Sequence, residues 1–111
     1  MEMGSLSLQR AHTEALSGDP AAARETLAKV RAGGKYLSPC QQSLVHVALA
    51  RAAQGEERAY ELQQTYELLD EALQIHDCWL LTLHIDRRFE PLWRDPRFQQ
   101  IVRAVGAAPA G

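Results

Sequence analysis

The chain has 111 residues, of which 46% are hydrophobic and 23% are charged, and its formal net charge is −2. The length suits one domain, residues 1–111, and the apolar content excludes a globally disordered chain. The near-balance of charge disfavours a nucleic-acid binder, which usually carries a basic excess. It also gives no attraction to an anionic membrane surface.

The sequence shows no pattern for targeting or for crossing a membrane. No apolar run approaches the roughly 20 residues of a membrane span. Residues 1–10 lack the basic and apolar regions of a secretion signal. The chain has two cysteines, Cys40 and Cys78, fewer than a secreted disulfide scaffold usually carries. We therefore expect a cytoplasmic protein with reduced thiols.

Two helices are predicted before Gly33. Apolar residues at steps of three and four indicate the first helix over residues 5–17. The second begins after Asp19 as N-cap, with Pro20 in its first turn, where the missing N–H costs nothing. No segment of the chain shows a sustained alternation with period two, so no strand is predicted.

Two further helices follow. The third begins after Ser38 as N-cap and runs from Pro39 to about residue 54. It is apolar nearly all round, which is typical of a helix buried between neighbours. The fourth, over residues 56–76, has a seam of residues at steps of three and four, which can pack against another helix. The seam comprises Ala59, Leu62, Tyr66, Leu69, Leu73 and His76.

The C-terminal part contains shorter elements. A short apolar helix or helical turn is predicted over residues 79–85, and a last helix that begins at Pro96 and ends before Gly106 as its C-cap. The motif Asp-x-Arg-Phe begins at Asp86 and again at Asp95. In each copy the Asp can cap a helical turn while the Phe enters the core.

The longer helices form two similar units, expected to be antiparallel hairpins over residues 5–33 and 38–77. Gly18 and Gly55 close the first helix of each pair. The period of roughly 36 residues is close to the value of about 34 in the tetratricopeptide repeat. The chain therefore resembles a tetratricopeptide-repeat protein, although neither hairpin has the Trp that usually stands near its start.

The C-terminal part is similar to the end of many bacterial tetratricopeptide regions. The similarity lies in residues 36–39, 50–55 and 89–98, the last of which matches the end of the pattern D-P-x-F-x-P-L-R-x-D-P-R-F. In this chain Arg87 replaces the first Pro of that pattern, and Trp93 stands where Arg is usual.

The resemblance implies an all-α fold with two tetratricopeptide-like hairpins in a short right-handed superhelix, followed by capping helices over residues 78–106. It also implies a non-catalytic module without a cofactor that binds a protein or peptide partner. The partner-binding groove would comprise Leu8, His12, Leu16, Gln42, Val45, Leu49 and Ala53. Because such a groove is apolar, a partner, a second copy or the chain's own C-terminal helix must fill it.

Self-association is a further expectation. Solenoids usually need three or more units, so two hairpins with a long seam predict a homodimer. Its contact would include Leu62, Tyr66, Leu69 and Leu73. An alternative is a regulatory or sensory fragment whose groove takes a small apolar ligand. A minor enzyme would need a polar cluster, for which His12 and His46 are the candidates.

Reactive and metal sites have little support in the sequence. Cys40 lies in the first turn of a predicted helix, whose dipole lowers the pKa of a thiol, but no motif ties a base to it. The pair His76-x-Cys78 is half of a zinc site at best. We predict no catalytic residue and no metal. An anion site is an alternative explanation for Arg87, Arg88, Arg94 and Arg97.

Overall fold

The computed structural model describes residues 3–34 and 36–107, and within them the chain is built from helices with no strand. This confirms the prediction of an all-α fold. The elements are α1 (Met3–Leu16), α2 (Pro20–Ala32), α3 (Pro39–Ala52), α4 (Gly55–Gln74), the 3-10 helices η1 (Cys78–Thr82) and η2 (Arg87–Leu92), and α5 (Pro96–Ala107).

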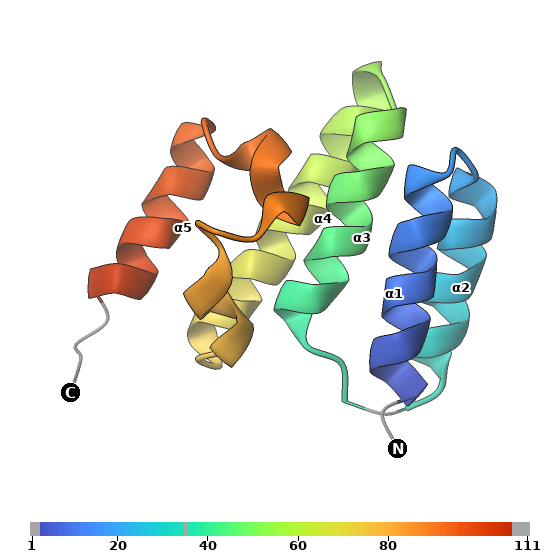
Figure 1. Ribbon diagram of the computed structural model, residues 1–111, viewed down its shortest axis with the longest axis horizontal. Coiled ribbons are helices and arrows are strands. Elements are labelled where there is room, and N and C mark those ends of the chain that lie inside the picture. The colour runs from blue at the N-terminus through green and yellow to red at the C-terminus, as the bar shows by residue number, and fades with distance from the viewer. Residues whose placement is uncertain (1–2, 35, 108–111) are drawn as a thin grey trace.

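α1 and α2 lie side by side and run in opposite directions, and so do α3 and α4 (Figure 1). α1 contacts α2, α3 contacts α4, and α3 packs against α1. α5 stands at the opposite end of the molecule from α1 and α2, and η1 and η2 lie between α5 and the central helices (Figure 1). The molecule measures 40 × 36 × 20 Å, so it is about two helices thick.

The predicted starts of α2 and α3 are confirmed by their capping contacts. The side chain of Asp19 accepts a hydrogen bond of 3.1 Å from the backbone N–H of Ala22. The hydroxyl of Ser38 accepts one of 3.2 Å from the N–H of Gln41. Each contact satisfies a donor that the first turn of a helix leaves without an intrahelical partner.

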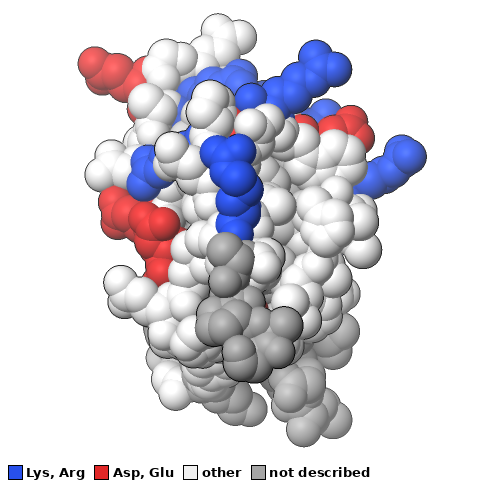
Figure 2. Space-filling model, turned by 90° about the vertical axis from the view of Figure 1, so that its left-hand side faces the viewer, with Lys and Arg blue, Asp and Glu red and all other residues white. Residues whose placement is uncertain are grey.

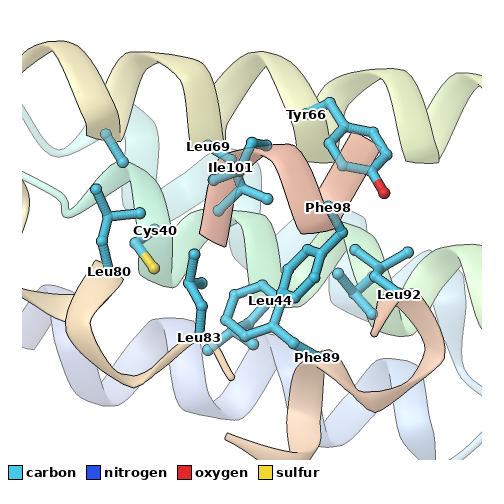
Figure 3. Close-up of a cluster of buried hydrophobic side chains, with 12 residues drawn as sticks. Cys40, Leu44, Tyr66, Leu69, Leu80, Leu83, Phe89, Leu92, Phe98 and Ile101 are labelled. Atoms are coloured by element: carbon cyan, nitrogen blue, oxygen red, sulfur yellow. The ribbon is translucent and has the colours of Figure 1, made fainter. Parts of the chain in front are cut away.

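The repeated Asp-x-Arg-Phe motif also behaves as predicted. Each Asp accepts a hydrogen bond from the backbone N–H two residues later, at 3.0 Å for Asp86 and 2.9 Å for Asp95. Phe89 and Phe98 are both buried, and their ring centroids lie 5.6 Å apart (Figure 3). The motif therefore starts η2 and α5 and brings the two rings into one core.

Several predicted boundaries differ from the structure. α3 ends two residues early, because Ala53 and Gln54 are extended. α4 ends at Gln74, and His76 takes a positive φ of 55°, which a helix cannot continue. α5 includes Gly106 rather than ending before it.

α3 separates two hydrophobic clusters, which explains why it is apolar all round. Toward α1 and α2 it contributes Val45, Ala48 and Leu49. Toward α4, η1, η2 and α5 it contributes a second set (Figure 3). That set comprises Cys40, Leu44 and Val47.

One buried carboxylate joins the start of α3 to the start of η1. Asp77 accepts hydrogen bonds from the hydroxyl of Ser38 and from the backbone N–H groups of Cys40, at 3.2 Å, and Trp79, at 3.1 Å. The two helix ends share the Asp77 carboxylate as their acceptor. It therefore links residues that are separated by 37 and 39 positions in the chain.

Candidate functional site

The residues predicted to line a partner groove do not form an open groove. Val45 and Leu49 are 0% and 1% exposed and belong, with Leu8, to the cluster between α1, α2 and α3. The other members are buried Ala53, half-buried His12 and Gln42, and exposed Leu16. The expectation is corrected for a packing reason: α1 and α2 lie directly against this side of α3.

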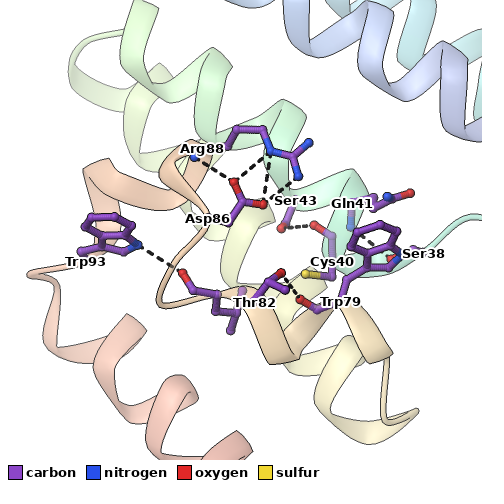
Figure 4. A network of polar contacts seen from close by, with 10 residues as sticks. Ser38, Cys40, Gln41, Ser43, Trp79, Thr82, Asp86, Arg88 and Trp93 are labelled. Carbon is purple, nitrogen blue, oxygen red and sulfur yellow. Dashed lines mark hydrogen bonds and ion pairs between the residues drawn. The ribbon is translucent and has the colours of Figure 1, made fainter.

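A small recess remains where α1 approaches η2. His12 and Arg88 line it together with Leu44, and its volume is about 10 Å³. That space holds about one water molecule. Arg88 is itself fixed by Asp86, whose Oδ2 accepts a hydrogen bond of 2.7 Å (Figure 4). The chain's own C-terminal segment therefore covers this part of α3.

Two of the four residues predicted for self-association are buried in the core, and the other two are half-buried. Tyr66 and Leu69 are 3% and 0% exposed and pack against residues of α5 and η2, while Leu62 and Leu73 are half-buried at the edge of the same cluster. The hydroxyl of Tyr66 donates a hydrogen bond of 2.7 Å to Asp95. Because α5 already covers this seam, Tyr66 and Leu69 are not available to a second copy, and the expectation is corrected for these two.

The two cysteines have different surroundings. Burial, reinforced by Asp77, raises the pKa of Cys40 to about 12, so this thiol stays protonated. Cys78 is exposed. In residues 3–34 and 36–107, no group of three or more His, Cys, Asp or Glu side chains is placed to share a metal ion.

The four arginines of the alternative anion site have separate surroundings. Arg88 pairs with Asp86, and Arg97 lies 4.5 Å above the ring of Tyr66 and 3.6 Å from Asp70. Arg87 and Arg94 are exposed. Arg88 therefore holds a contact within the C-terminal segment, whereas Arg97 links α5 to α4.

Two cavities border α5. One cavity there, of about 410 Å³, is named the Trp93 cavity, and its lining is His84, Trp93, Phe98, Gln99, Val102 and Arg103. The indole N–H of Trp93 donates a hydrogen bond of 3.1 Å to the carbonyl of Leu83, which fixes the ring at the cavity wall (Figure 4).

A second cavity, of about 350 Å³, lies near the C-terminal end of α5 and is named the Leu81 cavity. Its apolar lining is Leu73, Leu80, Leu81, Ala104 and Val105, and its polar lining is His76, Asp77 and Cys78. It is formed where α4, η1 and α5 meet, so it depends on three elements.

Large apolar side chains are exposed in η1 and on either side of it in the chain. Leu81 and Ile85 are 68% and 65% exposed, and Ile75 and Trp79 are 48% and 44% exposed. Figure 2 shows the side of the molecule on which α5 lies, where uncharged residues make up much of the surface and Lys and Arg gather toward one end. Contiguous exposed apolar surface is typical of contact sites, so this side of the molecule is the candidate contact surface.

A polar cluster lies away from α5, between α2, α3 and α4. The buried carboxylate of Glu61 accepts from the ring N–H of His46 at 2.8 Å and from the guanidinium of Arg24 at 3.0 Å. Arg31 reaches the other ring nitrogen of His46 at 3.0 Å and donates to the amide oxygen of Gln42 at 2.9 Å. No sequence motif links these residues. The one sign of the cluster in the sequence is Glu61, a charged residue on the inner face of α4.

The contacts decide the protonation state of His46. A guanidinium donates hydrogen bonds and cannot accept them, so Nε2 of His46 must be the acceptor for Arg31. Nδ1 therefore carries the proton and donates to Glu61. The ring is neutral, and burial lowers its pKa in agreement with this assignment.

The buried ring should make stability depend on pH. Burial lowers the pKa of His46 from its ordinary value of 6.5, against the opposing effect of Glu61. The unfolded chain therefore takes up the proton first. The contribution of His46 is complete above about pH 6.5 and is lost as the pH falls through the lowered pKa, with a slope of up to about 1.4 kcal/mol per pH unit. Urea titrations between about pH 7 and about pH 5.5 should show this fall, and His46→Gln should flatten it.

His12 acts in the same direction, because burial and the charge of Arg88 lower its pKa too. Part of the slope should therefore remain in His46→Gln. A slope that His46→Gln does not alter contradicts the assignment of a neutral, buried ring.

Comparison with family models, with curated proteins and with solved structures finds no match for this chain. Within the part of the chain that the structure describes, no helix is long and apolar enough to cross a membrane. The residues and their geometry are therefore the basis for a functional proposal.

Proposed function

We propose that this chain is a non-catalytic interaction module of the tetratricopeptide kind, which binds an amphipathic helix of a protein or peptide partner along α5. The repeated order of two antiparallel helix pairs and the two capped Phe turns support the kinship. A short right-handed superhelix is the arrangement that this kinship implies. The observation that carries the binding function is the exposed apolar surface beside the Trp93 and Leu81 cavities.

The position of this surface supports a helical partner. Helical repeats stack side by side, and the end of such a stack needs a polar cap for solubility. Here the end helix α5 is flanked by exposed Leu81 and Ile85 instead. A helix placed alongside α5 would insert apolar side chains at steps of three and four into the two cavities. The partner's apolar stripe is therefore the feature that this surface selects.

The polar rim adds a preference of charge. The polar residues that line the Trp93 cavity are His84, Gln99 and Arg103, and none of them is acidic. An acidic residue at the edge of the partner's apolar stripe would face Arg103. Such a rim contact orients a partner more than it adds affinity.

A displayed library of amphipathic helical peptides tests the proposal. We expect selected peptides to bind the chain, and Leu81→Asp to weaken their binding at least about tenfold, because a desolvated Leu contact is replaced by a charge. Leu16→Asp is the matched control, since Leu16 is 53% exposed on α1, far along the chain from α5. Dissociation constants measured by calorimetry for both variants give the comparison.

The remaining outcomes identify other occupants. Light scattering that shows a dimer, lost in Leu81→Asp and kept in Leu16→Asp, makes a second copy the occupant. Melting shifts with small apolar compounds favour the regulatory alternative, because both cavities have the volume of small-molecule sites. Absence of peptide binding, dimer and ligand shift contradicts a contact surface at α5.

A further inference from the structure

A third cavity, of about 160 Å³, opens beside the polar cluster of α2, α3 and α4. One part of its wall is apolar and comes from Leu27, Ala28 and Leu49. The other part is polar and includes Arg24 and Arg31. The cavity is separate from the two cavities at α5, and the proposed function does not use it.

The charges around this cavity do not balance. Glu61 forms an ion pair with Arg24 at 3.0 Å and offsets one of the two guanidinium charges. Arg31 contacts Gln42, which is uncharged, and His46, which its contacts make neutral. Among the residues that the structure describes, Arg31 therefore forms no ion pair, and the wall carries one positive charge in excess.

Arg31 is oriented before any ligand arrives. Its Nε donates to Gln42 at 2.9 Å and its Nη2 contacts His46 at 3.0 Å, which leaves the rest of its five N–H donors for another acceptor. His46 is in turn fixed by the buried Glu61. A ligand that binds here meets a guanidinium whose side-chain freedom is already restricted, which lowers the entropic cost of binding.

We propose that this cavity binds a carboxylate group carried on a short apolar chain, with Arg31 as its principal partner. One excess positive charge matches a monoanion better than a phosphate dianion. The apolar wall of Leu27, Ala28 and Leu49 accepts the hydrocarbon part. The volume is below the usual range of about 300–1,000 Å³ for whole ligands, so the cavity takes a terminal group rather than a large molecule.

Partial desolvation of Arg31 is consistent with this assignment. Burial lowers the pKa of Arg31 from its ordinary value, against the attraction of Tyr60 and Glu61. A carboxylate in the cavity would restore the interaction that the guanidinium loses with water. Arginine suits the task because its planar fork matches a carboxylate in a bidentate contact.

A titration followed by NMR at the arginine Nε–H signals tests the proposal. The probe is 3-methylbutanoate, and its amide is the uncharged analogue of the same shape. We expect the acid to shift the Arg31 signal with saturation and the amide to leave it unchanged. Arg31→Gln should raise the dissociation constant of the acid at least about tenfold, because a charged hydrogen bond is lost. Arg58→Gln, at an exposed arginine of α4, is the matched control and should bind normally.

A second pair of variants keeps the test valid if Arg31→Gln does not fold. Ala28 is exposed at the cavity wall, so Ala28→Glu places a tethered carboxylate beside the two arginines. We expect Ala28→Glu to abolish binding of the acid and Ala28→Gln to weaken it less. Equal binding by both variants overturns the proposal.

Two further arms identify the source of the carboxylate. A short peptide ending in leucine is compared with its C-terminally amidated form. If the free peptide binds more tightly than 3-methylbutanoate and the amidated peptide does not bind, the source is a chain terminus. If only the small acid binds, the source is a free metabolite-sized acid. Inorganic phosphate that binds as tightly as the acid, or no saturable shift with any carboxylate, overturns the proposal.

Discussion

Replacing Phe89 with alanine is expected to lower the free energy of unfolding by about 3–5 kcal/mol. Phe89 is 1% exposed and packs against Phe98 with ring centroids 5.6 Å apart. Removing the ring loses its apolar burial and leaves a space between α3, η2 and α5 that the surrounding backbone cannot close. Urea unfolding followed by circular dichroism measures the change.

The matched control for this prediction is Tyr36→Ala. Tyr36 is 75% exposed, so its loss should change the free energy of unfolding by less than about 0.5 kcal/mol. A cost below about 1 kcal/mol for Phe89→Ala would show that the C-terminal segment does not pack firmly on α3. Two separate unfolding transitions in the wild type would also show that the C-terminal segment does not pack firmly on α3.

Replacing Glu61 with alanine is expected to cost about 3 kcal/mol, the second largest effect. Glu61 is 1% exposed and accepts hydrogen bonds from His46 and Arg24. Without it, the buried ring N–H of His46 has no acceptor, and Arg24 loses its partner. Arg24 is half-exposed and regains water, so most of the cost comes from His46 and the lost packing.

Glu67→Ala is the control for this effect, because Glu67 lies on the same helix and is exposed, and its loss should cost less than about 0.5 kcal/mol. A double-mutant cycle of Glu61→Ala with His46→Ala should show a coupling energy of about 1–3 kcal/mol. Additive losses in that cycle, or a Glu61→Ala cost equal to that of Glu67→Ala, contradict the buried pair.

The C-terminal segment decides which surface the molecule can offer to a partner. η2 and α5 cover the side of α3 and α4 that the sequence marks as an apolar seam. What remains open is the far side of η1 and α5, with Leu81 and Ile85 exposed. Phe89→Ala and Leu81→Asp therefore probe different properties: the first tests whether the segment is docked, and the second tests what binds to its outer side.

Local signals in the sequence were sufficient to predict the helices. Asp19 and Ser38 cap helices that begin with proline, and the paired Asp-x-Arg-Phe motifs start η2 and α5. Capping depends on residues two or three positions apart, so it can be read from the chain directly. The exception is the exact end of each helix. His76, with its positive φ, shows that the conformation after α4 was not predictable from residue type.

The sequence by itself determined that the chain is helical, where most helices begin, and that α3 is buried on all sides. Tertiary structure alone decided which elements bury it, because apolar spacing marks a buried face without naming its neighbour. For that reason the groove predicted at Val45 and Leu49 is an internal contact, and the seam at Tyr66 and Leu69 is covered by α5. The contact of Arg31, His46 and Glu61 likewise exists only because three helices converge.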